Sequence, residues 1–308
     1  MNAAILVSIL MTVAAAATPL LLAALGELVV EKSGVLNLGV EGMMLIGAVT
    51  AFAVSVTTGS PALGAIASMV TAAAASGIFA ALTLGLASNQ VATGLALTIF
   101  GTGISALAGA PYVGITTTRL GPIFPDALAD DPYWRLIFGH SPLVYIALLM
   151  TLAVWWFLKH SRSGLILRAV GESDDAAHSI GYPVLKVRAL AILFGGAMAG
   201  LAGSFYSLVV TPMWAERLTA GRGWIAIALV VFASWRPGRL AAGAYLFGAV
   251  ITLELQAKAA GLSALAPEFM SSLPYLATIA VLVMISAGRR SIKNAAPACL
   301  GKPFRASA

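Results

Sequence analysis

The sequence predicts an all-α fold, a polytopic bundle of transmembrane helices, and three observations support this prediction. Of the 308 residues, 60% are hydrophobic and only 10% are charged, whereas a soluble domain has roughly 25% charged residues. The apolar residues gather in runs of about 20, the length that a helix needs to cross a bilayer. The basic residues also segregate between alternate loops, as they do in multi-pass membrane proteins.

The apolar runs predict about nine spans, and none of the sequence between them is long enough for a soluble domain. The first run lacks a basic n-region, so we interpret it as an uncleaved span rather than a signal peptide. Two other spans contain small residues on one face, in "GTGISALAGA" and "GGAMAGLAGS", a pattern that favours close helix packing. The predicted spans are 3–25, 38–56, 62–87, 91–110, 142–158, 189–210, 223–235, 239–257 and 268–288.

The distribution of basic residues predicts the orientation of the chain. One set of alternate loops holds thirteen of the eighteen, namely Lys32, Lys159, Arg162, Arg168, Lys186, Arg188, Arg236, Arg239, Arg289, Arg290, Lys293, Lys302 and Arg305. The other set holds the remaining five, Arg119, Arg135, Arg217, Arg222 and Lys258. Because cytoplasmic loops carry an excess of Lys and Arg, we expect the N-terminus outside and the C-terminus in the cytoplasm. The acidic stretch with Asp126, Asp130 and Asp131 then lies in an external loop.

Two segments depart from the pattern of a simple span. The stretch "GELVVEKSGVLNLGVEGMMLIGA", residues 26–48, is interrupted by Gly34, Asn37 and Gly39, and residues 221–239 are too short for an ordinary crossing and are bounded by Gly and Pro. Irregular backbone at membrane depth is tolerated only where protein or a water-filled cavity satisfies its polar groups. We therefore expect two interrupted helices that lie beside a polar pathway.

The first of these segments also carries four charged residues in apolar surroundings. We expect Glu27, Glu31 and Lys32 at the cytoplasmic mouth, where they can stay hydrated or pair. Glu27 and Glu31 are one helical turn apart and would repel each other unless a cation lay between them. Glu41 lies deeper in the membrane and is the costlier charge. Two roles stay open for these residues, to cap the interrupted helices or to line the pathway.

The cytoplasmic loop 159–188 contains the signals of a short helix of its own. Ser173 can serve as the N-cap, Asp174 and Asp175 favour the positive end of the helix dipole, and Gly181 followed by Pro183 ends the helix. A short capped helix between two spans is typical of a docking element, although an ordinary connecting loop would show the same signals.

Four blocks of the sequence resemble one protein family. They are "GELVVEKSGVLNLGVEGMMLIGA", "NQVATGLALTIFGTGISAL", "SGLILRAVGESDDAAHSIGYPV" and "GRGWIAIALVVFASWRPGRLAAGAYLFGA", and they follow one another over nearly the whole chain. Together they resemble permease subunits of bacterial ABC importers of the branched-chain amino acid and simple-sugar permease family. Within it they are most similar to nucleoside permeases that work with a basic-membrane-protein-type lipoprotein. The resemblance implies a single permease domain over 1–308 with a type II-like ABC importer fold.

The resemblance also implies a coupling helix that sits in a groove of an ATPase subunit. The residues expected to form the coupling site are Arg168, Gly171, Glu172, Ser173, Ala176, Ala177 and Gly181, of which all but Ser173 match the family's pattern. The family usually has Asn-Pro where this chain has Ser173 and Asp174, so the entry into the helix differs. The further partners implied are an extracytoplasmic substrate-binding protein and a second, longer permease in a heterodimer, although a homodimer stays open. Cargo would cross by alternating access in the bacterial inner (plasma) membrane.

The sequence itself supports a transport subunit without catalytic residues. It has no G-x-x-x-x-G-K-[ST] phosphate loop, so ATP must be hydrolysed by a partner chain. Its three histidines, His140, His160 and His178, lie at loop edges, and its one cysteine, Cys299, is expected to be a bystander thiol. We expect no cofactor, no metal site and no nucleic-acid partner; the partners besides proteins are membrane lipid and a small solute.

The identity of the cargo is the least determined point. Nucleosides or purine-like solutes come first by resemblance, followed by simple sugars and branched-chain amino acids, and the polar pathway candidates are Asn37, Glu41, Asn89 and Gln90. An ion-coupled secondary transporter would need a buried acid at mid-span, for which Glu254 is the candidate outside residues 26–48. A membrane-embedded enzyme would need a cluster of titratable groups at one depth, which the sequence does not show.

Overall fold

The computed structural model describes residues 3–125, 128, 131–259, 272, 276, 279, 283 and 296–304, and the regular structure in this part of the chain is helical. The α-helices are α1 (Ala3–Lys32), α2 (Val40–Thr58), α3 (Pro61–Ala80), α4 (Gln90–Gly109), α5 (Pro132–Phe138), α6 (Pro142–His160), α7 (Arg162–Glu172), α8 (Asp174–Ser179), α9 (Val184–Phe205), α10 (Arg222–Phe232) and α11 (Pro237–Ala259). Short extensions follow α3, α4 and α9, namely η1 (Ala81–Gly85), η2 (Ala110–Tyr112) and η4 (Tyr206–Val210).

Seven helical stretches in the described residues are long and apolar enough to cross a membrane, which makes this a multi-pass membrane protein. They are Ile5–Lys32, Val40–Thr58, Pro61–Gly85, Gln90–Tyr112, Pro142–His160, Val184–Val210 and Pro237–Lys258. The predicted span 223–235 corresponds to α10, which has 11 residues and is too short to cross by itself. The predicted span 268–288 lies almost entirely outside the described residues.

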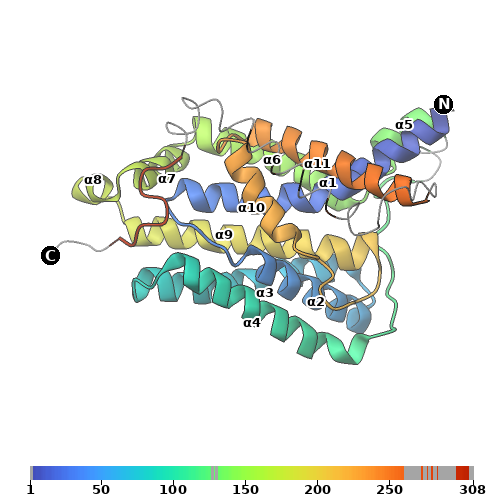
Figure 1. Ribbon diagram of the computed structural model, residues 1–308, viewed down its shortest axis with the longest axis horizontal. Helices are drawn as coiled ribbons and strands as arrows, with labels where there is room; N and C mark the ends of the chain where they lie inside the picture. The colour runs from blue at the N-terminus through green and yellow to red at the C-terminus, as the bar shows by residue number, and fades with distance from the viewer. Residues whose placement is uncertain are drawn as a thin grey trace.

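Helices α1 and α9 form the centre of the bundle. Helix α9 packs against α1, α2 and α3, and α1 also packs against α11, α10 and α6, so that α2, α3 and α4 lie on one side of the central pair (Figure 1). The inner half of α1 is almost completely buried and mostly apolar, as expected for a helix with neighbours all round, and its buried polar residues include Glu27 and Glu31. The start of α1 and α5 lie at one end of the bundle, and α7, α8 and residues 296–304 lie at the other (Figure 1).

The small residues of the predicted packing motifs lie where helices approach closely. A Cβ added to Gly47 of α2 would lie 2.5 Å from the Cα of Gly200 of α9. A Cβ on Gly101 of α4 would lie 2.5 Å from the carbonyl oxygen of Gly42 of α2. Larger residues at these positions would force the helices apart, so glycine is what brings α2 between α4 and α9.

Candidate coupling and translocation site

A buried stretch of non-helical backbone, segment 33–39, connects α1 to α2. Side chains from three directions satisfy its amide groups: Asn37 N–H donates to Glu27 Oε1 (3.1 Å), Leu36 N–H to Gln90 Oε1 (2.8 Å) and Gly39 N–H to Asn37 Oδ1 (2.8 Å). Buried amides without partners are costly. The polar residues of this region therefore hold the backbone of segment 33–39 in place.

Glu41, in the first turn of α2, caps the start of α10. Its Oε1 accepts from the Thr219 hydroxyl (2.5 Å) and from Gly221 N–H (2.8 Å), and its Oε2 accepts from Gly223 N–H (2.6 Å). The carboxylate thus lies at two helix N-termini, its own and that of α10, and both dipoles favour a negative charge there. The approach is close, because a Cβ on Gly223 would lie 2.7 Å from the Cα of Glu41.

The other end of α10 is also held by a glutamate of residues 26–48. Glu31 Oε2 accepts a hydrogen bond from the indole Nε1–H of Trp235 at 2.6 Å. Trp235 follows α10 in a left-handed conformation, with φ of 55°, which turns its ring back toward α1. Helix α10 therefore lies between two carboxylates that are ten residues apart in sequence, Glu31 and Glu41.

Of the three residues that were expected to be hydrated or paired at a cytoplasmic mouth, two are buried rather than hydrated. Glu27 is 1% exposed and Glu31 is 0% exposed, and only Lys32 is partly accessible, with its ammonium 5.9 Å from the centroid of a Trp235 ring. Helix α1 runs to Lys32, beyond the predicted span 3–25, and carries both acids into the core. Each has one buried oxygen, Glu27 Oε2 and Glu31 Oε1, without a hydrogen-bond partner among the described residues.

The predicted short helix in the loop 159–188 is confirmed as α8. The Ser173 hydroxyl accepts from Ala176 N–H at 3.3 Å, and Gly181, with φ of +89°, reverses the chain after the helix. Asp174 and Asp175 occupy the first turn, where the dipole favours them. The preceding α7 has an exposed polar face and a buried apolar face.

Arg188 of α9 is fully buried and binds three separate parts of the chain. Its Nε donates to the Ser33 carbonyl (3.1 Å), its Nη1 donates to the Lys302 carbonyl (3.5 Å), and its Nη2 forms an ion pair with Asp174 Oδ2 (2.9 Å). Removing one partner of such a buried ion pair is strongly destabilising. Arg188 therefore fixes the start of α8 against the end of α1.

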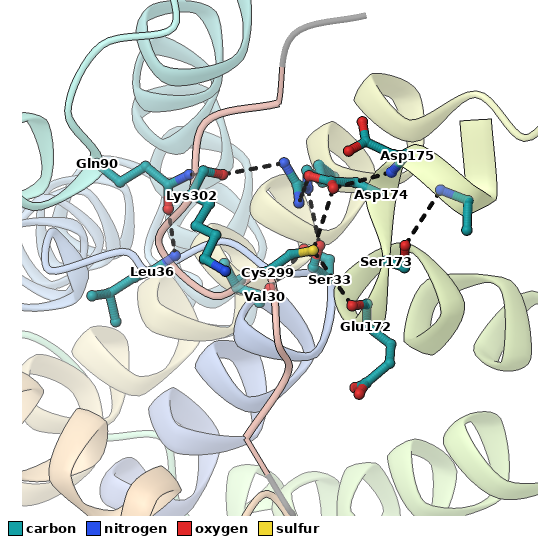
Figure 2. Close-up of polar contacts among 12 residues, drawn as sticks. Val30, Ser33, Leu36, Gln90, Glu172, Ser173, Asp174, Asp175, Cys299 and Lys302 are labelled. Atoms are coloured by element: carbon teal, nitrogen blue, oxygen red, sulfur yellow. Dashed lines mark hydrogen bonds and ion pairs between the residues drawn. The ribbon is translucent and has the colours of Figure 1, made fainter. Parts of the chain in front are cut away.

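The C-terminal segment, residues 296–304, crosses the same region (Figure 2). Cys299 N–H donates to the Gly171 carbonyl (3.0 Å), Gly301 N–H donates to the Gly34 carbonyl (3.1 Å), and the Lys302 carbonyl also accepts from the Gln90 amide (3.4 Å). The Cys299 thiol lies 3.3 Å from Asp174 Oδ1, and burial raises its pKa. Cys299 is thus part of the packing around α8 rather than a bystander.

Comparison with known proteins identifies the family. Residues 9–285 match the family described as the permease component of branched-chain amino acid transport systems. The chain belongs to this family. The permease is 42% identical over 307 residues to a putative glucose ABC transporter permease protein, TsgC13, of Haloferax volcanii, and the match covers 92% of this chain and 93% of that protein.

Two further relatives are named for nucleosides. The guanosine ABC transporter permease protein NupQ of Bacillus subtilis is 30% identical, over 86% of this chain and 88% of its own length. The nucleoside ABC transporter permease protein NupC of Lactococcus lactis is 25% identical, over 87% and 88% of the two chains. The chain is therefore an ABC transporter permease, and its relatives include sugar and nucleoside permeases.

The predicted coupling residues of this permease fall into two groups. Arg168, Glu172, Ser173 and Ala176 are exposed, whereas Gly171 and Ala177 are buried. Ala177 packs in a small apolar cluster with Val170, Val184 and Phe304. Gly171 lies against the last turn of α1, so close to the Lys32 carbonyl that no side chain would fit. Gly181 forms the turn after α8.

The four pathway candidates all have contacts with the backbone. Asn37 and Glu41 hold segment 33–39 and α10, Gln90 bridges segment 33–39 and the C-terminal segment, and the exposed Asn89 caps α4 by accepting from Ala92 N–H at 3.0 Å. None of them lines the two cavities of about 580 and 420 Å³ described for this permease. Their contact with cargo stays a prediction.

Sequence reasoning missed Arg188, Thr219 and Trp235. Arg188 was counted only as a cytoplasmic charge, although an arginine next to the apolar run "ALAILF" is a signal that a buried partner exists. Trp and Thr are common hydrogen-bond donors, so the sequence does not single out Trp235 and Thr219. Only the tertiary structure brings them to Glu31 and Glu41.

Proposed function

We propose that this permease is the transmembrane subunit of an ABC importer, and that α8 is the helix through which a separate ATPase subunit drives alternating access. The observation that carries the proposal is the connection between α8 and segment 33–39. Arg188 contacts Asp174 at the start of α8 and Ser33 at the start of segment 33–39. A displacement of α8 is therefore passed to the interrupted part of the bundle.

The exposed surface of α8 and α7 suits a protein partner. Asp175, Ala176 and Ile180 are exposed, and Ile180 is 71% exposed, a large apolar side chain beside charged ones. A protein–protein contact typically combines an apolar centre with a polar rim. Residues 33–39 and the start of α10 lie deeper in the bundle, and they are the irregular backbone that transporters place along their pathways.

The proposal includes the partners and orientation that the resemblance implies. An extracytoplasmic binding protein delivers the solute at the end where α5 lies, and a second permease completes the pathway in a heterodimer. The membrane is the plasma membrane, with the N-terminus outside and α7, α8 and the C-terminus in the cytoplasm, in accord with the segregation of basic residues.

We propose a neutral solute that contains a sugar ring, either a nucleoside or a simple sugar. The relatives named for guanosine, nucleosides and glucose support this class, since these compounds share a hydroxyl-rich ring. The sequence alone placed nucleosides first among the expected solutes. Because the identity is higher to the relative named for glucose, we give simple sugars the same rank as nucleosides.

An ion-coupled mechanism, the alternative that the sequence left open, would have to work through buried acids. Buried acids without full hydrogen bonding are typical of proton and cation relays, and Glu27 and Glu31 each have one oxygen without a partner in the described residues. Glu254, by contrast, forms an ion pair with Lys258 at 2.7 Å near the end of α11.

Reconstitution separates the two candidates. The full chain is placed in proteoliposomes alone, and with its cognate ATPase, second permease and binding protein, and uptake of labelled guanosine and glucose is measured with and without ATP. We expect uptake only in the complete assembly with ATP. Uptake by the chain alone under a proton or sodium gradient would establish the ion-coupled candidate. A third outcome is that the assembly takes up neither solute and hydrolyses ATP in response to a branched-chain amino acid. That result would show that the proposed solute class is wrong.

A further inference from the structure

A second polar site lies at the end of the bundle opposite α7 and α8. It is a cavity of about 420 Å³ bounded by the start of α1, the loop before α5, α5 itself, the start of α6 and the end of η4. None of its residues makes the hydrogen bonds or ion pairs described above for segment 33–39, α8 and α10. Its polar lining consists of Ser8, Thr12, Arg119, Arg135, His140 and Ser141.

The two arginines give this cavity a positive charge that the described chain does not neutralise. Arg119 Nε donates to the Val209 carbonyl at 2.7 Å, which fixes the guanidinium at the cavity. Neither arginine forms an ion pair with a carboxylate among the described residues. Guanidinium groups bind phosphate and carboxylate oxygens in a bidentate manner, so two of them at one cavity favour an anionic group.

Ser141 provides an independent indication of a ligand. It is 8% exposed, and its Oγ is buried without a hydrogen-bond partner in the described part of the chain. It precedes α6 in the N-cap position, yet its hydroxyl makes no capping hydrogen bond. Burial also lowers the pKa of the neighbouring His140, whose imidazole is hydrogen-bonded to the backbone of Leu136. A hydroxyl left unpaired beside two guanidinium groups is explained by an acceptor that the cavity receives.

The remaining walls are apolar and belong to membrane-crossing helices. Met11 of α1, Val144 of α6 and Phe205 of α9 line the same cavity, and all three helices are among those long enough to span the bilayer. The cavity therefore offers anion-binding groups beside a hydrocarbon-compatible wall at one end of the membrane-spanning region. A free inorganic anion would use only the polar half, whereas a phospholipid would use both.

We propose that this cavity binds a membrane phospholipid, with its phosphate at Arg119 and Arg135 and the first part of an acyl chain against the apolar wall. The hydroxyl of Ser141 donates to the phosphate or an ester oxygen. The site is separate from the proposed transport function and holds the start of α1 against α5 and α6. A negative result in the transport experiment would therefore not count against the lipid site.

Native mass spectrometry of the delipidated full-length chain, titrated with dioleoyl phosphatidylglycerol, tests the proposal. Arg119→Gln and Arg135→Gln should each weaken lipid binding by about tenfold, the effect of losing one charged hydrogen-bonded contact. Arg217→Gln is the matched control, because Arg217 is an exposed arginine that does not line the cavity. Equal binding by all three variants would overturn the proposal.

Two further experiments complete the test. One identifies the source of the anion, and the other shows whether a variant loses binding only because it misfolds. Monoolein, which has the chain without the phosphate, should not compete; competition by inorganic phosphate at equal concentration would show a free-anion site and overturn the lipid assignment. Ser141→Ala should weaken lipid binding while leaving the melting temperature without lipid unchanged or higher, because it removes an unpaired buried hydroxyl. A Ser141→Ala chain that melts earlier without lipid and binds phosphatidylglycerol normally would contradict the proposal.

Discussion

The glutamates of residues 26–48 are kept in the membrane by hydrogen bonds to backbone and indole groups. Glu27 holds segment 33–39, Glu31 holds Trp235, and Glu41 holds the first amides of α10. A buried acidic side chain is tolerated at membrane depth when it accepts hydrogen bonds from neighbouring donors. The carboxylates therefore act as fixed acceptors for backbone that has left the helical hydrogen-bond pattern.

The three donors at Glu41 predict a clear order of stability among its variants. Glu41→Gln should lower the free energy of unfolding by about 2 kcal/mol, because the amide offers one acceptor oxygen and turns donors toward the Gly223 amide. Glu41→Ala should cost more, since all three donors lose their partner. Thermal unfolding of the purified chain in detergent measures both changes.

Glu254→Gln serves as the comparison for Glu41→Gln. It removes the same charge from another membrane helix, but from an i,i+4 pair with Lys258, where a loss of about 0.5 kcal/mol or less is expected. Equal effects of the two glutamine variants would show that the contacts at the start of α10 add nothing to stability.

At the scale of elements, α8 illustrates what sequence can and cannot predict. Its position was predicted correctly because Ser173, the following aspartates and Gly181 act locally, through capping and turn geometry. Its orientation was not, because a helix of six residues has too few turns to show which side is apolar. The buried side of α8 is set by Phe304, which is 127 residues beyond Ala177 in sequence.

Neighbouring alanines of α8 should therefore respond differently to arginine. Ala176→Arg places a large cation on the exposed surface, so transport and substrate-stimulated ATP hydrolysis should fall together while membrane abundance stays normal. Ala177→Arg places a guanidinium in the apolar cluster with Val170 and Phe304, so abundance itself should fall. Immunoblotting of membranes, uptake and ATPase assays distinguish the two outcomes. If Ala176→Arg preserves both activities, docking must occur elsewhere, for example at residues 235–239.

The interrupted segments show a second limit of sequence-based prediction. Gly34, Asn37 and Gly39 lie in the non-helical connection between α1 and α2, and residues 223–235, counted among the predicted spans, correspond to the short helix α10. The sequence left hydration or pairing open for Glu27 and Glu31, because their position near a basic residue resembles a membrane boundary. Their partners, Asn37 and Trp235, determine that α1 stays helical and buried to Lys32.

At the scale of the whole molecule, the two ends of the bundle are built from different elements. One end has α7, α8 and the C-terminal segment, and the other has α5 and the start of α1 (Figure 1). The general architecture follows from hydropathy alone, because each span must be about 20 apolar residues long. The contacts that join the parts, such as those of Arg188, come from residues far apart in sequence, which no local pattern predicts.

The orientation of the bundle can be measured with single cysteines after Cys299→Ser. Tyr133→Cys, at a position 70% exposed at the α5 end, should react with a membrane-impermeant thiol reagent in intact cells. Ser163→Cys, on the exposed face of α7, should react only after the membrane is permeabilised. Asp130, in the acidic stretch, lies outside the described residues, so Tyr133 represents that end. The opposite labelling pattern would invert the bundle.

The capping of α10 by Glu41 has a consequence for biosynthesis. The carboxylate lies 182 residues ahead of Gly223, so it enters the membrane long before its partner leaves the ribosome. Until then Glu41 has to stay hydrated. An apolar helix of 11 residues is in turn too short to be recognised as a crossing on its own. Helix α10 is therefore a late component, which packs against helices that are already in the membrane. In ribosome-bound chains that end before residue 219, the carboxylate of Glu41 should still be exposed to water.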